Sequence, residues 1–391
     1  MISLKSGAKL FSGQVLTSIV SLATIPYLAK IYSIEEFGFL GLLQSIILII
    51  GSVSGLRLET SLVENYKSTR MKKIKAVFFV MVLIVNSISL AIVALLLNLS
   101  WELMSFLLAG GVSIGLISYI EKLLLAKARN IEFVVLQSGK VILPVIFHFA
   151  FRDHSWYLMI IGFCLAHFLL SLIFSRYFLA HLFVPRIKDI REVLITERKY
   201  TGTILSTTLV SQLNERLPLI VFGGLEPSLG GLLNIASKIT IAPLSAFYGF
   251  LRNLFFKVAF EEESLSLKAF TKKYMALNLV LLGSICVFLV SISEYVSDTY
   301  FNHLDGLEII IRLLAIYACS KVILVPLSAV LIKLNHHKEI LIINSVRLAL
   351  SIAVVLGYLF GVFNSDFLLY TLYLVSSLTY IIHSISIWKK I

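Results

Sequence analysis

The chain alternates between long apolar runs and short polar connectors along its whole length. Runs of about 20 apolar residues can cross the hydrocarbon core of a bilayer as helices. We expect twelve such spans, in two sets of six. They lie roughly at 9–31, 38–63, 76–98, 103–126, 131–150 and 156–180, then at 203–222, 228–257, 274–293, 307–332, 338–360 and 366–388. The pattern predicts an all-α integral membrane protein.

Composition agrees with this interpretation. Apolar residues make up 58% of the chain and charged residues only 14%, whereas soluble domains are about one quarter charged. The three cysteines, Cys164, Cys286 and Cys319, all lie inside apolar runs, which favours free thiols over disulfides. We expect neither a metal nor a cofactor. Lys5 and Lys9 precede an apolar run that is too long for a cleavable signal peptide.

The positions of Lys and Arg predict the orientation, because cytoplasmic connectors retain them. With the N-terminus inside, the outer connectors hold essentially Lys30 and Arg152. The inner connectors and the C-terminus hold Lys67, Arg70, Lys72, Lys73, Lys75, Lys127, Arg129, Arg186, Lys188, Arg191, Arg198, Lys199, Lys257, Lys268, Lys272, Lys273, Lys333, Lys338, Lys389 and Lys390. Both termini are therefore expected in the cytoplasm. The net charge of +12 then faces an anionic leaflet, and no nucleic acid is needed to explain it.

Two similar segments indicate an internal repeat. IPYLAKIYSIEEFGFLGLLQSI (25–46) and LPLIVFGGLEPSLGGLLNIASKI (217–239) each place a proline and a glycine twelve positions apart. The pairs are Pro26 with Gly38 and Pro218 with Gly230, offset by 192 positions. We therefore expect a six-helix bundle at 1–180, a cytoplasmic interfacial linker at 181–202 and a second six-helix bundle at 203–391. Two pseudo-symmetric bundles around a central cavity are typical of transporters built from repeats.

Ionisable residues at membrane depth are the candidate site, because each is costly there and is normally functional or paired. Cations outnumber acids by about three to one among them, which predicts a cationic cavity with an anionic cargo or at least a water-filled vestibule. The candidates for cargo binding are Lys140, Lys238, Arg347, Arg216, Lys321, Arg57 and Arg252, and the candidates for ion coupling are Glu59 and Glu215. The remaining ionisable residues are Glu121, Lys122 and Arg312.

Helical spacing predicts which of these residues share a face. Asn234 and Lys238 step by four, and Asn344 and Arg347 by three. Within one continuous span, Arg57 would point about 200° away from Glu59, so both could not face one cavity.

Simpler interpretations stand beside the functional one. Arg57, Glu121, Lys122 and Arg252 lie within about two turns of the inner interface and could reach it by snorkelling. Glu215 could be only the partner of a cation on a neighbouring helix. His148 and His167 are more often packed than metal-bound. The glycine pairs Gly51/Gly55, Gly111/Gly115 and Gly357/Gly361 favour close helix packing.

The N-terminal residues bring a resemblance to a known family. The lysines before the first span, the connector YSIEEFGFLGLLQSI and the following GLRLETSLV (55–63) resemble O-antigen flippases of the Wzx type. These belong to the multidrug/oligosaccharidyl-lipid/polysaccharide exporter superfamily. The two six-span halves extend this resemblance, less specifically, over the whole chain.

The resemblance implies a flippase for undecaprenyl-diphosphate-linked oligosaccharide, such as an O-antigen repeat unit, in the bacterial inner membrane. Its implied partners are that lipid-linked glycan, a coupling ion (H⁺ or Na⁺), the lipid bilayer and other polysaccharide-assembly proteins. Two rivals stay open. A multidrug antiporter would share the fold but would call for an acidic cavity. A membrane glycosyl polymerase or ligase would be an enzyme, and we see neither its large outer loop with Arg and His nor a nucleophile beside a base.

Overall fold

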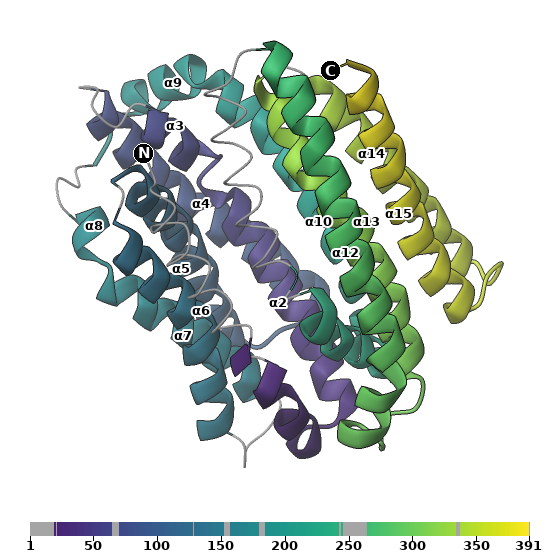
Figure 1. Cartoon of the computed structure of the whole chain (residues 1–391). Coiled ribbons are helices and arrows are strands. Elements are labelled where there is room, and N and C mark those ends of the chain that lie inside the picture. Colours follow the sequence, from purple (N-terminus) through teal and green to yellow (C-terminus); the bar gives the residue numbers. More distant parts are fainter. Residues whose placement is uncertain are drawn as a thin grey trace. The chain divides into compact units, whose positions relative to one another are not determined.

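In a computed structural model of the chain, every regular element of the described residues is a helix (Figure 1). The structure describes residues 19–20, 22–64, 70–127, 129–151, 157–179, 184–241, 244, 264–333 and 337–390.

The helices of the first half begin with Leu22–Ile31. They continue with α2 (Ile34–Ser54), α3 (Leu58–Glu64), α4 (Met71–Leu97), α5 (Trp101–Ala126), α6 (Asn130–Ala150), α7 (Tyr157–Ile173) and the short α8 (Arg176–Leu179). The connector that follows holds α9 (Ile187–Thr196) and the π-helical turn η1 (Lys199–Ile204).

The helices of the second half begin with α10 (Leu205–Leu225) and a helix at 227–241. They end with α12 (Ser264–Tyr300), α13 (Leu307–Lys333), α14 (His337–Leu359) and α15 (Ser365–Lys390). Each of the expected spans overlaps a described helix, which confirms the all-α prediction. Six of the described helices are long and apolar enough to cross a membrane by length and composition alone, and Leu22–Ile31 and Tyr157–Ile173 are shorter apolar helices.

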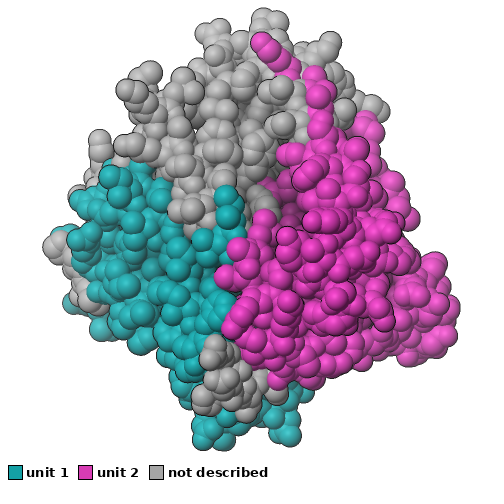
Figure 2. Space-filling model, turned by 60° about the horizontal axis from the view of Figure 1, so that its bottom comes forward, with its two compact units in different colours: residues 1–21, 40–212 teal, residues 22–39, 213–391 magenta. Residues whose placement is uncertain are grey.

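The chain divides into two compact units (Figure 2). Unit 1 contains Leu40–Gln212, and unit 2 combines Leu22–Phe39 with the described residues that follow Gln212. The boundary lies inside α2, so the beginning of this helix packs with the second half of the sequence.

The two units use the same pattern of helix contacts. In unit 1, α5 packs against α4, α6 and α7, and α6 packs against α7. In unit 2, α13 packs against α12, α14 and α15, and α14 packs against α15. These contacts correspond one to one when α4–α7 are matched with α12–α15 in chain order. The core of unit 1 is apolar and aromatic, with Phe78, Tyr119, Leu136 and Phe178 among its buried members.

The second expected span is not one continuous helix. After α2 ends at Ser54, Leu56 and Arg57 adopt left-handed conformations with φ of 51° and 61°, and α3 then begins at Leu58. The predicted angle of about 200° between the Arg57 and Glu59 side chains assumed one continuous helix, and the break means that this assumption does not hold. That prediction was wrong, because the turn brings the Arg57 guanidinium to 2.9 Å from the Glu59 carboxylate.

Glycines make close helix contacts in unit 1, as expected. A Cβ on Gly51 would lie 3.1 Å from the carbonyl oxygen of Gly111 and 2.7 Å from Ile114, so α2 and α5 approach closely here. Gly361 is different, because it has φ of 73° and open space around it. It serves the left-handed turn after α14 and does not pack a helix, so the packing prediction was wrong at that position.

The connector between the halves folds back onto unit 1 through α9. Val193 is buried, and Lys73 of α4 lies 3.2 Å from Asp189 and 3.0 Å from Glu192. The Lys73 ammonium and then the Arg186 N–H hold the pKa of the Asp189 carboxyl below its usual range. A carboxyl group whose pKa is lowered by folding stabilises the fold at pH values above its unfolded-state pKa. This stabilisation is lost only as the pH falls through the pKa of the folded state. The contact is therefore kept at neutral pH.

Candidate functional site

Lys140, on α6 of unit 1, forms an ion pair with the adjacent helix α5. Its Nζ lies 2.5 Å from Glu121 Oε1 and 3.4 Å from Gln137 Oε1. Both charged side chains are partly buried, at 32% and 24% exposure. The candidate cargo contact Lys140 is therefore already paired with a carboxylate on another helix.

Arg57 and Glu59 form a second pair, at the break between α2 and α3. Glu59 is 2% exposed and Arg57 20% exposed. One oxygen of the carboxylate, Oε1, accepts no aligned hydrogen bond in the described structure although it lies 2.9 Å from the guanidinium. Glu59 is therefore a buried carboxylate held beside the Arg57 guanidinium.

Glu215, on α10 of unit 2, pairs with Lys321 on α13 at 2.9 Å. The interpretation of Glu215 as a partner for a neighbouring-helix cation therefore agrees with this contact. Arg216 follows it on α10 and is partly buried. Each carboxylate that the sequence places at membrane depth thus lies within ion-pair distance of one cation.

Arg347, on α14, is buried in unit 2 among phenol rings and a hydroxyl. It is 2% exposed. Its Nε donates to Ser376 Oγ at 3.0 Å and its Nη2 to Tyr317 Oη at 3.4 Å. Its guanidinium carbon lies 4.7 Å from the centre of the Tyr380 ring. Ser376 and Tyr380 are one turn apart on α15, so one face of that helix supplies both contacts.

Lys238 and Asn234 meet the same residue at the start of α2. The Asn234 side-chain amide donates to the Phe37 carbonyl at 2.8 Å, and the Lys238 ammonium lies 5.5 Å from the centre of the Phe37 ring. The predicted shared face of these two residues is therefore present. No described carboxylate lies within ion-pair distance of Lys238. The candidate Arg252 lies outside the described residues.

The start of α2 also makes a close backbone contact with the helix at 227–241. A Cβ on Gly38 would overlap the carbonyl oxygen of Pro227, and one on Gly231 would overlap that of Ile34. Ser228 donates to the Glu35 carboxylate at 2.8 Å. The two segments that suggested the repeat are thus in direct contact, and this contact positions Phe37 beside Lys238.

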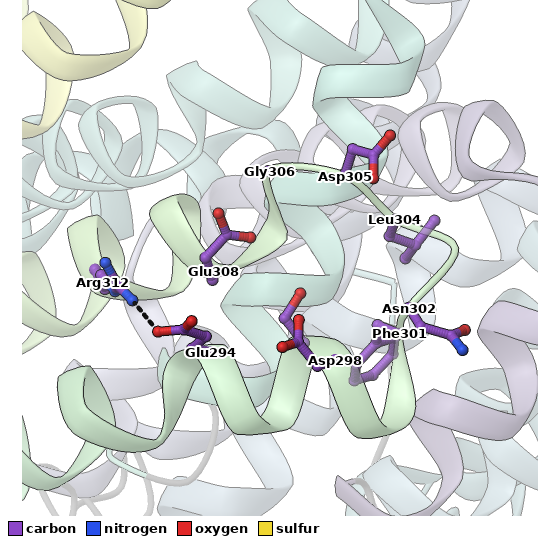
Figure 3. Close-up of a pocket in the computed structure, with 10 residues that line it drawn as sticks. Glu294, Asp298, Phe301, Asn302, Leu304, Asp305, Gly306, Glu308 and Arg312 are labelled. Atoms are coloured by element: carbon purple, nitrogen blue, oxygen red, sulfur yellow. Dashed lines mark hydrogen bonds and ion pairs between the residues drawn. The ribbon is translucent and has the colours of Figure 1, made fainter.

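A polar pocket of about 380 Å³ lies where α12 and α13 are joined (Figure 3). Glu294 and Asp298 come from α12, Asp305 from the connector and Glu308 from α13, while Arg312 reaches Glu294 at 3.4 Å (Figure 3). No group of three possible metal ligands is found in the described residues. Four of the residues that line the pocket are acidic and one is basic.

Sequence reasoning missed the aromatic partners of the deep cations. Phe37, Tyr317 and Tyr380 are each more than 25 positions from the cation that they contact. One signal was present, since Tyr373 and Tyr380 recur seven apart among small hydroxyl residues on the last span. That spacing marks one helix face, but it does not show which cation the face meets.

A scan of the sequence against protein-family models finds no match, and a search of curated proteins finds no relative. Solved structures do match over nearly the whole chain. A MOP-superfamily transporter from Pyrococcus furiosus, described as having a binding pocket of reverse polarity that suggests a different function, matches at a TM-score of 0.68 and 11% identity, covering 99% of this chain and 94% of that one.

Two MATE structures match in the same way. One is a MATE transporter in complex with MaL6, with a TM-score of 0.65, 12% identity and coverage of 99% and 97%. The other is the eukaryotic MATE transporter AtDTX14, with a TM-score of 0.64, 12% identity and coverage of 99% and 95%. This multi-pass membrane chain therefore has the fold of the MATE transporters of the MOP superfamily. The matched structures are themselves described as transporters.

Proposed function

We propose that this chain carries undecaprenyl-diphosphate-linked oligosaccharide from the cytoplasmic to the periplasmic leaflet of a bacterial inner membrane, by ion-coupled alternating access. The shared fold of MOP-superfamily transporters and the Wzx-like N-terminal residues support this function. The proposal of an anionic cargo rests on the surroundings of Lys238. This cation at membrane depth contacts an aromatic ring and no described carboxylate.

The physical basis is the cost of moving charge into hydrocarbon. A diphosphate–sugar head cannot cross the bilayer unaided, because its charges and hydroxyls lose their water. A cation at that depth lowers this barrier, while it is itself costly to keep there without an anion. Lys238 and Arg347 are the leading cargo contacts in this proposal, with Arg216 and Arg252 behind them. Lys140, Lys321 and Arg57 contribute less, because each already has a carboxylate partner.

The test is complementation of a flippase-null strain by charge-neutral variants, with membrane protein quantified in parallel. Lys238→Ala is expected at normal levels with about a tenfold or larger loss of surface polysaccharide, since one charge-assisted contact is worth about 1.5–3 kcal/mol. Lys238→Arg should keep part of the activity, because the charge is retained. Lys140→Ala should instead lower the protein level, because it leaves Glu121 at membrane depth without its cation.

A matched control is Lys338→Ala, which removes an exposed cation at the start of α14. It should keep full surface polysaccharide at a normal protein level. Full glycan display by Lys238→Ala and Arg347→Ala together would contradict the cationic-cargo proposal.

A multidrug antiporter is the second candidate, and the fold of the MATE structures favours it equally. Cationic drugs are bound best by carboxylates that lack a partner, whereas Glu59, Glu121 and Glu215 each lie beside a cation. Expression of the chain in an efflux-deficient strain separates the two candidates. Resistance to cationic dyes without glycan complementation would select the antiporter.

A further inference from the structure

Unit 1 holds a basic pocket at the end that we expect to face the cytoplasm, and the proposed transport does not use it. The pocket has a volume of about 480 Å³. Four cations reach it from four places in the chain, namely Lys75 on α4, Lys127 after α5, Arg129 before α6 and Arg176 on α8. No carboxylate is among the described residues that line it. Four like charges around one hollow repel one another, and an anion between them would relieve that repulsion.

Tyr177 organises three of these cations. Its hydroxyl accepts from Arg129 Nη1 at 2.8 Å and from Arg176 Nη2 at 3.4 Å. The Lys127 ammonium lies 6.0 Å from the centre of its ring. Glu132 pairs with Arg129 at 2.9 Å and with Arg176 at 3.1 Å without lining the pocket. The two guanidinium groups are thus held in place at a pocket lined by four cations, a geometry suited to a phosphate group.

An apolar groove lies next to this basic pocket along α4 and α5. Met71, Lys75, Phe79 and Leu83 recur every four residues on α4, so they form one stripe from the basic pocket into the groove. The facing stripe on α5 is Leu123, Tyr119, Leu116 and Val112. The groove has a volume of about 380 Å³ and is lined almost entirely by apolar side chains.

Aromatic rings form the junction between the two parts. Phe79 lies 6.0 Å from Tyr119 and 5.7 Å from Phe178, measured between ring centres. Tyrosine side chains such as Tyr119 favour the level where lipid headgroups meet hydrocarbon. The site therefore offers charge on one side of these rings and an apolar groove on the other, which matches the charged head and the apolar chains of a phospholipid.

We propose that this site binds one anionic phospholipid of the surrounding leaflet, with its phosphate between Arg129, Arg176 and Lys75 and one acyl chain along the α4–α5 groove. Basic pockets between membrane helices are recognised places for anionic headgroups. The basic pocket lies at the end of α4 and α5 that carries the Lys- and Arg-rich connectors, and the groove extends from that end toward the middle of the two helices. A lipid of the cytoplasmic leaflet would therefore have its head at the basic pocket and its acyl chain in the groove. This inference does not depend on what the protein transports.

The experiment measures lipid binding to the purified full-length protein by native mass spectrometry. Phosphatidylglycerol is compared with phosphatidylcholine of the same acyl chains. The wild type should bind phosphatidylglycerol more tightly, and Arg129→Gln with Arg176→Gln should weaken that binding by roughly fivefold for each cation removed. Binding of phosphatidylcholine should not change. Lys substitutions at the same two positions should keep most of the preference.

Two control variants sharpen the result. Arg191→Gln removes an exposed cation of α9 outside the pocket, and it should leave the preference intact. Leu116→Trp fills the groove without changing any charge, so it should weaken phosphatidylglycerol binding although the basic pocket is whole. An unchanged preference in the double Gln variant would overturn the proposal. So would equal competition by inorganic phosphate, or retention of a polyprenyl diphosphate but not of phosphatidylglycerol.

Discussion

At the scale of single residues, charges at membrane depth occupy two kinds of environment. Glu59, Glu121 and Glu215 each lie beside a cation, and breaking such a pair leaves one charge without compensation. Lys238 and Arg347 lie against aromatic rings instead. A ring attracts a cation without neutralising it, so the positive charge stays available to an anionic group. The choice of partner therefore separates structural cations from candidate cargo contacts.

Only part of this division could be predicted from the sequence. The residue types and their depth are visible, because each interrupts an apolar run. Glu121 and Lys140 are 19 positions apart and lie on different helices, so their pairing depends on how α5 and α6 pack. A threefold excess of cations predicted a positive cavity without showing which cations are already neutralised.

Ion coupling is best tested at Glu59. Glu59 is the most buried of the three carboxylates at membrane depth, and its Oε1 accepts no aligned hydrogen bond in the described structure. We expect Glu59→Gln to lose the dependence of glycan export on pH or Na⁺, and to lose stability as well because Arg57 no longer has its carboxylate. Glu215→Gln should lower stability in the same way, by about 3–5 kcal/mol, since it leaves Lys321 without its carboxylate inside the bundle, but it should keep the ion dependence.

The measurement is export by each variant across a pH and Na⁺ series, with thermal unfolding of the purified protein alongside. Restoration of stability by Lys321→Met in the Glu215→Gln background would confirm that this pair is structural. If Glu59→Gln kept the ion dependence of the wild type, Glu59 would be a structural partner of Arg57 and not the coupling group.

At the scale of helices, the pattern of apolar runs was sufficient for most boundaries. Long uniform helices such as α4 and α5 begin and end within a few residues of the expected spans, because their ends coincide with polar connectors. The break after Ser54 was not predictable in this way. Arg57 and Glu59 interrupt the apolar run here without marking the end of a span, and the φ angles of Leu56 and Arg57 show that α2 has already ended.

The glycine contact between α2 and the helix at 227–241 gives an element-scale prediction. Gly38→Ala and Gly231→Ala would each push a methyl group into a backbone carbonyl oxygen, which cannot rotate away as a side chain could. We expect each to destabilise the protein by about 1–3 kcal/mol or more. Thermal unfolding in detergent measures the loss.

Gly224→Ala is the matched control, because this helical glycine has open space around its Cβ position. It should leave stability unchanged or raise it by up to about 1 kcal/mol, since alanine is the better helix former. Equal stability of Gly38→Ala and Gly224→Ala would mean that the two helix starts do not approach as closely as described.

At the scale of the whole molecule, the helix contacts support a duplicated architecture. The pairs formed by α4–α7 in unit 1 recur among α12–α15 in unit 2, although the sequence shows the repeat only in the first hairpin of each half. Lipid-facing positions accept many apolar residues, so repeats can diverge while their packing stays. That 1–180 and 203–391 superpose as complete six-helix bundles stays a prediction, which an experimental structure would check helix by helix.

The last prediction concerns the orientation of both halves. A half with six spans begins and ends on the same side, so a duplicated chain must place the second half in the orientation of the first. Single cysteines on a background without Cys164, Cys286 and Cys319 can test this. In intact inner membranes, an impermeant maleimide should label Ser100→Cys, before α5, and Asp305→Cys, before α13. It should reach Lys188→Cys, on α9, and Lys338→Cys, on α14, only after the membrane is opened, because connectors rich in Lys and Arg stay in the cytoplasm.

The opposite accessibility at all four positions would invert the proposed direction of transport. Labelling of Ser100→Cys without Asp305→Cys would show that the halves are inserted in opposite senses, and the parallel duplication would then be wrong.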